Sequence, residues 1–240
     1  MPAELYNQAM NFCTLRAPNP GPLTLEGTNT YVIEGTVVDP GSDHQKHLEA
    51  ILAAAGPVER IVLTHRHPDH AAGAGRLSEL SGASVLAFGA GLSDWDRVGE
   101  LVAIHTPGHA PDHLCFWHPG SRTLLSGDLI AGEGSILIAP PEGDLQAYVN
   151  SLERVRALAP SRILAGHGPE VQDAEAKIEE YLAHRREREA RVVAALGAGA
   201  SSLKEIVEAA YADVPLGKRR YAELSAQAHL EKLGHRISQG

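Results

Sequence analysis

The sequence predicts an α/β protein, and three observations lead to that prediction. Short apolar runs rich in β-branched residues, such as Ile61-Val62-Leu63, alternate with segments whose apolar residues recur at helical spacing. Several of these strand-like runs are followed at once by histidine or aspartate. Residues 173–240 contain helical patterns only. We therefore expect one α/β domain followed by a small helical segment.

The expected elements alternate along the chain, and Gly, Pro and capping residues mark their ends. Tyr31 to Asp39 predicts a hairpin that turns at Glu34-Gly35. Strands are predicted at residues 31–33, 36–39, 60–64, 85–88, 103–105, 114–117, 124–126 and 163–165. Helices are predicted at residues 43–55, 71–80, 144–158, 173–196, 201–214 and 219–233. Residues 89–99 are expected to form a short loop that leaves any nearby site open.

Residues 64–70 read THRHPDH and place three histidines and an aspartate directly after an expected strand. In an extended loop alternate residues face the same way, so His65 and His67 can meet one metal ion. Asp69 and His70, at the helix start, then turn toward another. A solvated loop would explain this segment alone. Three further strand-like runs, however, also end in a histidine or aspartate, namely His109, Asp128 and His167, and this repetition favours a metal centre.

Three more residues have predicted roles around such a centre. Asp39, after the second strand of the hairpin, is either the hydrogen-bond partner of a ligand histidine or an ordinary turn aspartate. His113 is expected to steady a loop by hydrogen bonding rather than to bind metal. Asp128 is the expected bridge, because a carboxylate has two oxygens and can join cations about 3.5–4 Å apart. Six other histidines are expected to be solvated or to cap turns: His44, His47, His118, His184, His229 and His235.

Over residues 12–172 the chain resembles the metallo-β-lactamase superfamily of dinuclear-zinc hydrolases, through His65, His67, Asp69, His70, His109, Asp128 and His167. Residues 20–31, 127–134 and 174–185 are similar to the lactamase-β-like protein 2 subfamily, whose better-studied members cut single-stranded RNA. The resemblance implies a four-layer αβ/βα sandwich with a metal site at one edge. It also implies three parts: a catalytic domain (1–172), a connecting helix (173–196) and a small winged-helix-like C-terminal module (197–240).

The expected mechanism follows from this resemblance. One zinc ion takes three histidines and the other takes Asp69 and two histidines, while Asp128 and a hydroxide bridge them. The metal-bound hydroxide is the nucleophile, since zinc lowers the pKa of water to about 7. Asp69 is the expected catalytic residue that orients the hydroxide or passes its proton on. Mn²⁺ or iron is an alternative in the position that carboxylates ligate.

The charge distribution bears on the substrate. The formal net charge is −9, and residues 1–172 hold 19 acids against 10 bases, whereas residues 173–240 hold 11 of each. An acidic domain is not an obvious partner for a polyanion. The one candidate nucleic-acid patch is Lys218, Arg219 and Arg220. Packing on the main domain or dimerisation would explain the module equally well.

Three functions remain open at this point. The first is hydrolysis of phosphodiester bonds in single-stranded RNA, and the second is hydrolysis of a small thioester, lactone or β-lactam. The third is metal-dependent nucleic-acid binding through residues 197–240. The two cysteines, Cys13 and Cys115, lack zinc-site or redox spacing, and no signal peptide or membrane span is apparent, so a cytoplasmic protein is expected. Nothing in the sequence indicates an oligomeric state.

Overall fold

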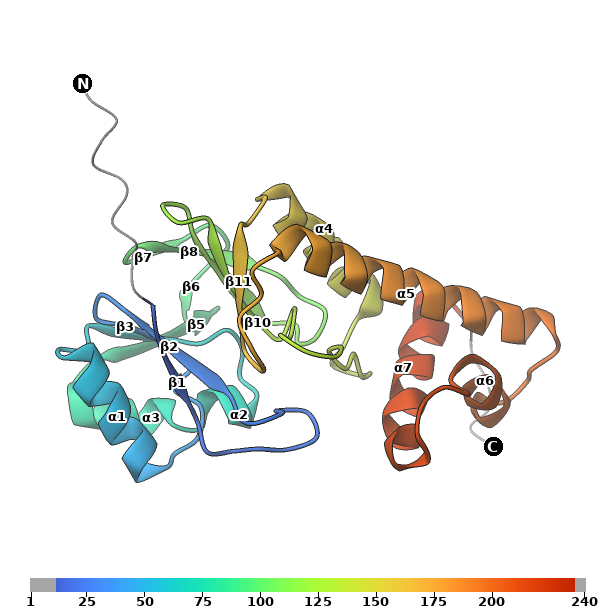
Figure 1. The fold of residues 1–240 in the computed structure, drawn as a ribbon, viewed down its shortest axis with the longest axis horizontal. Helices are drawn as coiled ribbons and strands as arrows, with labels where there is room; N and C mark the ends of the chain where they lie inside the picture. Colours follow the sequence, from blue (N-terminus) through green and yellow to red (C-terminus); the bar gives the residue numbers. More distant parts are fainter. Residues whose placement is uncertain (1–11, 236–240) are drawn as a thin grey trace, which may run out of the picture.

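Two β-sheets face each other and carry helices on their outer faces (Figure 1). The computed structural model describes residues 12–235. The first sheet has the order β1-β2-β3-β4-β5-β6, with β1 (Cys13–Arg16), β2 (Asn29–Ile33), β3 (Thr36–Val38), β4 (Arg60–Val62), β5 (Ser84–Phe88) and β6 (Gly91–Leu92). The second has the order β11-β10-β9-β8-β7, with β7 (Arg97–Val98), β8 (Leu101–His105), β9 (Leu114–His118), β10 (Thr123–Gly127) and β11 (Arg162–Ala165).

Strand β8 shows how the layers are built. Successive side chains of a strand point to opposite faces of the sheet. Leu101 and Ala103 pack into the core between the two sheets, whereas Val102 and Ile104 pack toward the outer helices. Because both faces are covered, the strand is an unbroken apolar run rather than an alternating one.

Four helices form the two outer layers. Helices α1 (Gln45–Ala55) and α3 (Ala74–Ser81) share a core with the first sheet, and α4 (Leu145–Ala157) and α5 (Ala174–Gly197) share one with the second. The prediction of a four-layer αβ/βα sandwich is therefore confirmed. The short helix α2 (Pro68–Ala71) lies beside the sheets and begins at His67, with Pro68 in the first helical position that proline favours.

The C-terminal module has its own small core. The second half of α5 packs with α6 (Leu203–Ala210) and α7 (Arg219–Lys232), and the 3₁₀ turn η1 (Leu216–Lys218) precedes α7. Ala228 of α7 belongs to the core of the main domain, so the module packs on that domain. Within residues 12–235 no strand follows β11, so the described part of the module consists of helices and turns.

The structure corrects several local expectations. The helix expected over residues 71–80 is interrupted at Gly73, where an added Cβ would lie only 2.9 Å from the carbonyl oxygen of Ser42. The expected loop at 89–99 contains the short edge strands β6 and β7. His47 and His229 are buried rather than solvated, because both lie on inward faces of helices. Over the described part of the chain, no helix has the length and apolar character needed to cross a membrane.

Candidate metal centre

The seven predicted ligands meet where four strands of both sheets end. His65 and His67 follow β4, and Asp69 and His70 lie in the first turn of α2. The other three follow strands of the second sheet, namely His109 after β8, Asp128 after β10 and His167 after β11. The donor atoms form two groups, one of three histidines and one of Asp69, His70, Asp128 and His167.

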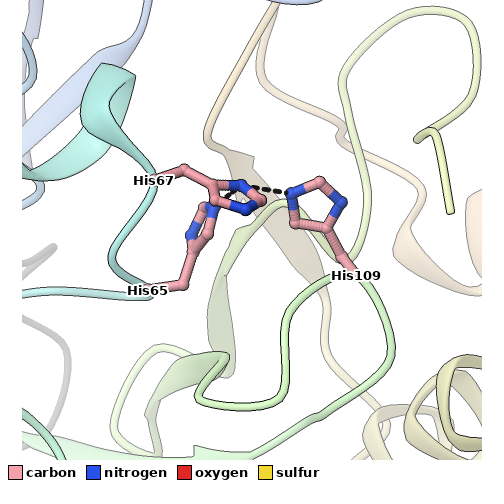
Figure 2. Close-up of side chains that lie close together, drawn as sticks. All are labelled: His65, His67 and His109. Carbon is pink, nitrogen blue, oxygen red and sulfur yellow. Dashed lines mark hydrogen bonds between the residues drawn. The ribbon is translucent and has the colours of Figure 1, made fainter. Parts of the chain in front are cut away.

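In the first group, three imidazole rings point their nitrogens toward one another (Figure 2). Nδ1 of His67 lies 3.0 Å from Nε2 of His65 and 2.9 Å from Nε2 of His109. The opposite ring nitrogens have oxygen partners. His109 Nδ1 donates to the carbonyl of Leu137 at 3.0 Å, and His67 Nε2 lies 3.2 Å from a Glu142 carboxylate oxygen.

These outer hydrogen bonds fix where the ring protons reside. A neutral imidazole carries one N–H, and a nitrogen that donates to an oxygen acceptor holds it. His109 and His67 therefore turn lone pairs inward. His65 does the same, because its Nδ1 lies 3.0 Å from Thr64 Oγ1, whose own proton goes to Asp39. Three lone pairs about 3 Å apart repel unless a cation lies among them. The donor set thus fits a metal ion that prefers nitrogen.

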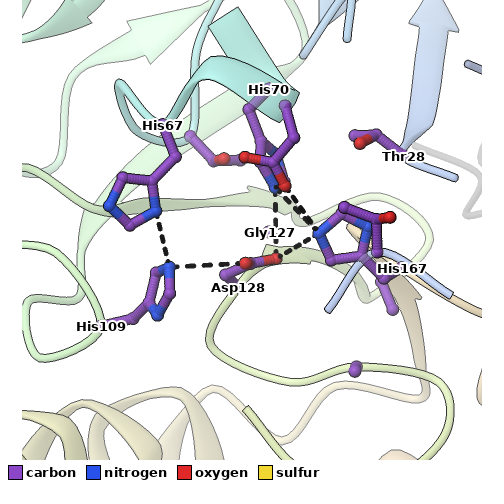
Figure 3. A network of polar contacts seen from close by, with 12 residues as sticks. Thr28, His67, His70, His109, Gly127, Asp128 and His167 are labelled. Atoms are coloured by element: carbon purple, nitrogen blue, oxygen red, sulfur yellow. Dashed lines mark hydrogen bonds and ion pairs between the residues drawn. The ribbon is translucent and has the colours of Figure 1, made fainter. Parts of the chain in front are cut away.

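The second group is richer in oxygen (Figure 3). Nε2 of His70 lies 3.2 Å from Nε2 of His167, and Asp128 Oδ1 lies 3.3 Å from each of them. Asp69 Oδ2 is 3.3 Å from His167 Nε2. His70 Nδ1 donates to Asp39, which turns the other ring nitrogen, Nε2, toward the centre, where a cation can take the place of its proton. This arrangement suits a second cation with nitrogen and oxygen ligands.

Asp128 faces both groups. Its Oδ1 points to the second group, whereas its Oδ2 lies 3.4 Å from Nε2 of His109 in the first. Oδ1 is fully buried and has no hydrogen-bond donor within the described chain. A buried carboxylate oxygen without a donor is costly, and a cation would satisfy it. The geometry is that of a carboxylate placed to bridge two cations.

Asp39 supports the second group by hydrogen bonding the ring nitrogen of His70 that faces away from the other donor atoms. It accepts hydrogen bonds from the amide of Thr64 at 2.7 Å, from Thr64 Oγ1 at 2.7 Å and from His70 Nδ1 at 2.8 Å. It is 2% exposed, so its charge is not screened by water. Of the two interpretations that the sequence left open, these contacts match the hydrogen-bonding one.

His113 positions the loop that carries Asp128. Its Nε2 accepts a hydrogen bond from the Asp128 amide at 3.0 Å, and its Nδ1 lies 2.9 Å from Thr106 Oγ1. Burial lowers the pKa of His113 to about 3, which keeps the ring neutral and able to accept. Gly127 precedes Asp128 with a φ of +48°, and an added Cβ would lie 2.8 Å from His113 Nε2. Only glycine fits there.

The two groups differ in charge. Burial lowers the pKa of His65 well below its usual value, so this ring is neutral. Burial has the same tendency at His70, but the carboxylates of Asp128 and Asp39 outweigh it and raise the pKa well above normal. For His167 burial is likewise outweighed, mainly by Asp128, and the pKa rises to about 9. The negative potential that attracts protons to these two rings also attracts a metal cation.

Sequence reasoning missed three supporting residues. Thr64 links Asp39 to His65, and Glu142 faces His67. Asn29 holds the loop of His167, since its side-chain amide donates to the carbonyls of Ala165 at 3.0 Å and Gly168 at 2.8 Å. Asn29 is the first residue of β2 and stands between Thr28 and Thr30, so no pattern in the sequence distinguished it.

A pocket of about 610 Å³ opens over the metal centre. His67, Asp69, His109 and Asp128 line it at one side, and the C-terminal module lines the other. Lys218 of the predicted basic patch lies on its wall, but Arg219 and Arg220 do not. Residues 89–99 do not line it, whereas loops before β2 and after β10, together with the module, form its walls.

Known proteins resemble this chain in sequence and in fold. The family model described as "Metallo-beta-lactamase superfamily" matches residues 23–97 and 96–167. A "Beta-lactamase-like protein 2 homolog" of Caenorhabditis elegans is 32% identical, over 90% of this chain and 81% of its own length. An "Atrochrysone carboxyl ACP thioesterase" of Aspergillus fumigatus is 28% identical, over 82% of this chain and 72% of its own.

Solved structures share the fold of this chain. A metallo-beta-lactamase family protein from Thermus thermophilus superimposes with a TM-score of 0.77 at 24% identity, covering 93% of both chains. A second protein, crystallised in a di-iron-bound form, gives a TM-score of 0.57 at 27% identity over 66% of this chain and 94% of its own. With its two facing sheets, its histidine and aspartate groups at their shared edge and these relatives, the chain belongs to the metallo-beta-lactamase superfamily of hydrolases.

Proposed function

We propose that this hydrolase cleaves the thioester or ester bond of small acyl compounds with the help of two metal ions. The observation that carries the proposal is the pocket of about 610 Å³ over the donor atoms. This volume lies within the range of small-molecule sites, roughly 300–1,000 Å³. Much of its wall is apolar and suits an acyl chain, through Leu23, Leu25, Ile136, Leu137, Val214 and Tyr221.

Two further observations support an acyl substrate. The relative from Aspergillus fumigatus, which is named as a thioesterase, aligns with 82% of this chain. The main domain is acidic, with 19 acids against 10 bases in residues 1–172, and such a surface attracts RNA poorly.

We propose zinc for the first group, because its three donors are all imidazole nitrogens. The second group includes carboxylate oxygens, and Mn²⁺ or iron would suit it as well as zinc. Cations in these positions would supply an activated water at neutral pH and would polarise the carbonyl of the substrate.

Asp69 is the proposed proton carrier. Its side chain is 29% exposed and lines the pocket, whereas that of Asp128 is 10% exposed and faces both donor groups. In the proposed reaction the water oxygen bonds to the acyl carbon and the carbon–sulfur bond breaks. The proton released by the water passes through the Asp69 carboxylate to the departing sulfur.

Cleavage of single-stranded RNA is the second candidate. It rests on the similarity to relatives named beta-lactamase-like protein 2 homologs and on Lys218 at the pocket wall. Arg219 and Arg220 lie outside the pocket wall, which reduces the basic surface that a strand of RNA would meet there.

A parallel assay separates the two candidates. Zinc-loaded protein is given an acyl thioester, a β-lactam and a labelled single-stranded RNA, with Asp128→Ala as the inactive control in each panel. Thioester turnover that the control lacks supports the proposal. Cleavage of RNA alone would replace it with the second candidate.

The role of Asp69 has its own test. Asp69→Asn keeps the size of the side chain but cannot carry the proton, so we expect kcat to fall by at least about 100-fold. Metal content measured by mass spectrometry should fall by much less than turnover does. Undiminished kcat in a variant with full metal content would show that Asp69 carries no proton.

A further inference from the structure

Arg185 is a buried cation on the wall of the pocket. It lies on α5, is 5% exposed and lines the same cavity as the metal-centre residues His67 and His109. One guanidinium nitrogen, Nη2, donates to the carbonyl of Ile136 at 2.6 Å, and the guanidinium lies 5.0 Å from the centre of the Tyr148 ring. Its Nε is buried and has no hydrogen-bond acceptor within residues 12–235.

Neighbouring arginines on α5 differ from Arg185. Arg186 lies 3.5 Å from a carboxylate oxygen of Glu153, and Arg188 forms a two-point ion pair with Asp213 at 2.7 and 2.8 Å. Arg185 has no such acid among the residues that the structure describes, although it is the most buried of the three. Buried charges in proteins are usually paired, since desolvating an isolated one is costly. Arg185 therefore lacks a counter-ion that a ligand can supply.

Other unpartnered polar groups surround the same part of the pocket. Tyr211 Oη, His184 Nδ1 and His229 Nδ1 are buried without a hydrogen-bond partner in the described chain, and all three residues line the cavity. Burial and the charge of Arg185 lower the pKa of His229 to about 4, so its ring is neutral near pH 7. A hydroxyl and neutral imidazoles beside an arginine can hydrogen-bond an oxyanion without adding negative charge.

The backbone ties this wall to the metal centre. Arg185 donates to the carbonyl of Ile136, and the ligand His109 donates to the carbonyl of the next residue, Leu137. Consecutive Cα atoms are about 3.8 Å apart. Arg185 and His109 are thus fixed to adjacent peptide units, and both face the cavity.

We propose that Arg185, with Tyr211 and His184 beside it, binds an oxyanion carried by the substrate while the scissile bond lies at the metal centre. The substrate class is then an acyl compound with a second, negatively charged group, a carboxylate or a phosphate. This specificity rests on the proposed acyl hydrolysis, but the binding of an oxyanion can be measured without turnover. Guanidinium groups favour both anions because they offer paired N–H donors.

The turnover test compares two thioesters of the same thiol, a butanoyl ester and a butanedioyl ester that ends in a free carboxylate. Release of the thiol is followed with a disulfide reagent that yields a coloured product when a thiol cleaves it. We expect the wild type to prefer the charged substrate in kcat/KM. In Arg185→Gln this preference should fall by at least tenfold, mainly through KM, and Arg185→Lys should restore part of it.

Arg186→Gln is the matched control, because it removes the same charge one residue away from a side chain that is 63% exposed. It should keep the wild-type preference. Tyr211→Phe removes a single hydroxyl and should reduce the preference by less than Arg185→Gln does, which covers the case in which Arg185→Gln fails to fold. Equal preference in the wild type, Arg185→Gln and Arg186→Gln would overturn the proposal.

A binding test stands apart from the reaction. The rise in Tm caused by inorganic phosphate and by glutarate is measured for the metal-loaded wild type, Arg185→Gln and Arg186→Gln. A rise that only Arg185→Gln lacks supports the oxyanion site even when no thioester is hydrolysed, and the more effective anion identifies the group. The same rise in all three proteins, or none, contradicts the site.

Discussion

The two donor groups of the metal centre differ in charge and in exposure. The first consists of imidazoles alone and includes His67, whose side chain is 30% exposed. The second contains two carboxylates, and its His70 is fully buried and backed by the buried carboxylate of Asp39. A negative, enclosed site holds a divalent cation more firmly than a neutral, open one. We therefore expect the second group to bind metal more tightly and to accept a wider range of metals.

Asp128→Ala should have the largest effect, because it removes the one side chain that faces both groups. We expect the loss of at least one metal ion per chain and a fall in kcat of more than about 100-fold, beyond the range for residues that only support ligands. Metal analysis and turnover measure the two effects. Asp43→Ala, an exposed aspartate, is the control, and retention of both metals by Asp128→Ala would contradict the bridging position.

The variants Asp39→Asn and Thr64→Val test separately the hydrogen bonds that support each donor group. Asp39 bonds His70 directly, whereas Thr64 connects Asp39 to His65. We expect Asp39→Asn to weaken metal binding in the second group by about 10–100-fold. Thr64→Val should instead weaken metal binding in the first group.

Chelator titration of each variant gives the affinities, and anomalous diffraction identifies which position empties first. If both variants empty the same position, the two groups are not supported separately. Both substitutions are also expected to lower stability by about 1–3 kcal/mol, because each leaves a buried polar partner unsatisfied.

Glu142→Gln should have the smallest effect. Glu142 is 51% exposed and faces the outer nitrogen of His67 at 3.2 Å. Interactions at such exposed positions contribute about 0–1 kcal/mol, so metal affinity in the first group should fall by no more than about fivefold. A larger loss, measured by the same chelator titration, would mean that the first group depends on its support as strongly as the second.

The metal centre could be predicted from the sequence because its ligands lie in the short segments that follow four strands, including the start of α2 after β4. The ends of neighbouring strands meet at one edge of a sheet, so short motifs far apart in the chain converge once the strands are placed. Gly127-Asp128 and His167 are brought together because β10 and β11 pair in parallel. The four-layer fold followed from the same strand pattern and the family resemblance.

The wall of the pocket formed by α5 and the C-terminal module could not be predicted from the sequence in this way. Arg185 and Tyr211 have no strand to place them, and their position depends on how α5 packs against the loop of Ile136 and against α7. His229 stands between Ala228 and Leu230, and a histidine in a helix with so few large apolar residues gave no clear sign that it faces inward. Of the predicted patch at residues 218–220, Lys218 alone lines the pocket, because successive residues at a helix start point in different directions.

Helix α5 fixes the distance between the two ends of the pocket. Its first half packs into the main domain through Ile178 and Tyr181, and its second half packs into the module through Val192 and Ala195. One residue added between these halves would advance the later turns of the helix by about 1.5 Å and rotate them by about 100°. Arg185 would then face away from the pocket if the insertion preceded it. Side chains on α5 that face the pocket can therefore be exchanged without disturbing either core, whereas a change in the length of α5 would displace one wall of the pocket relative to the other.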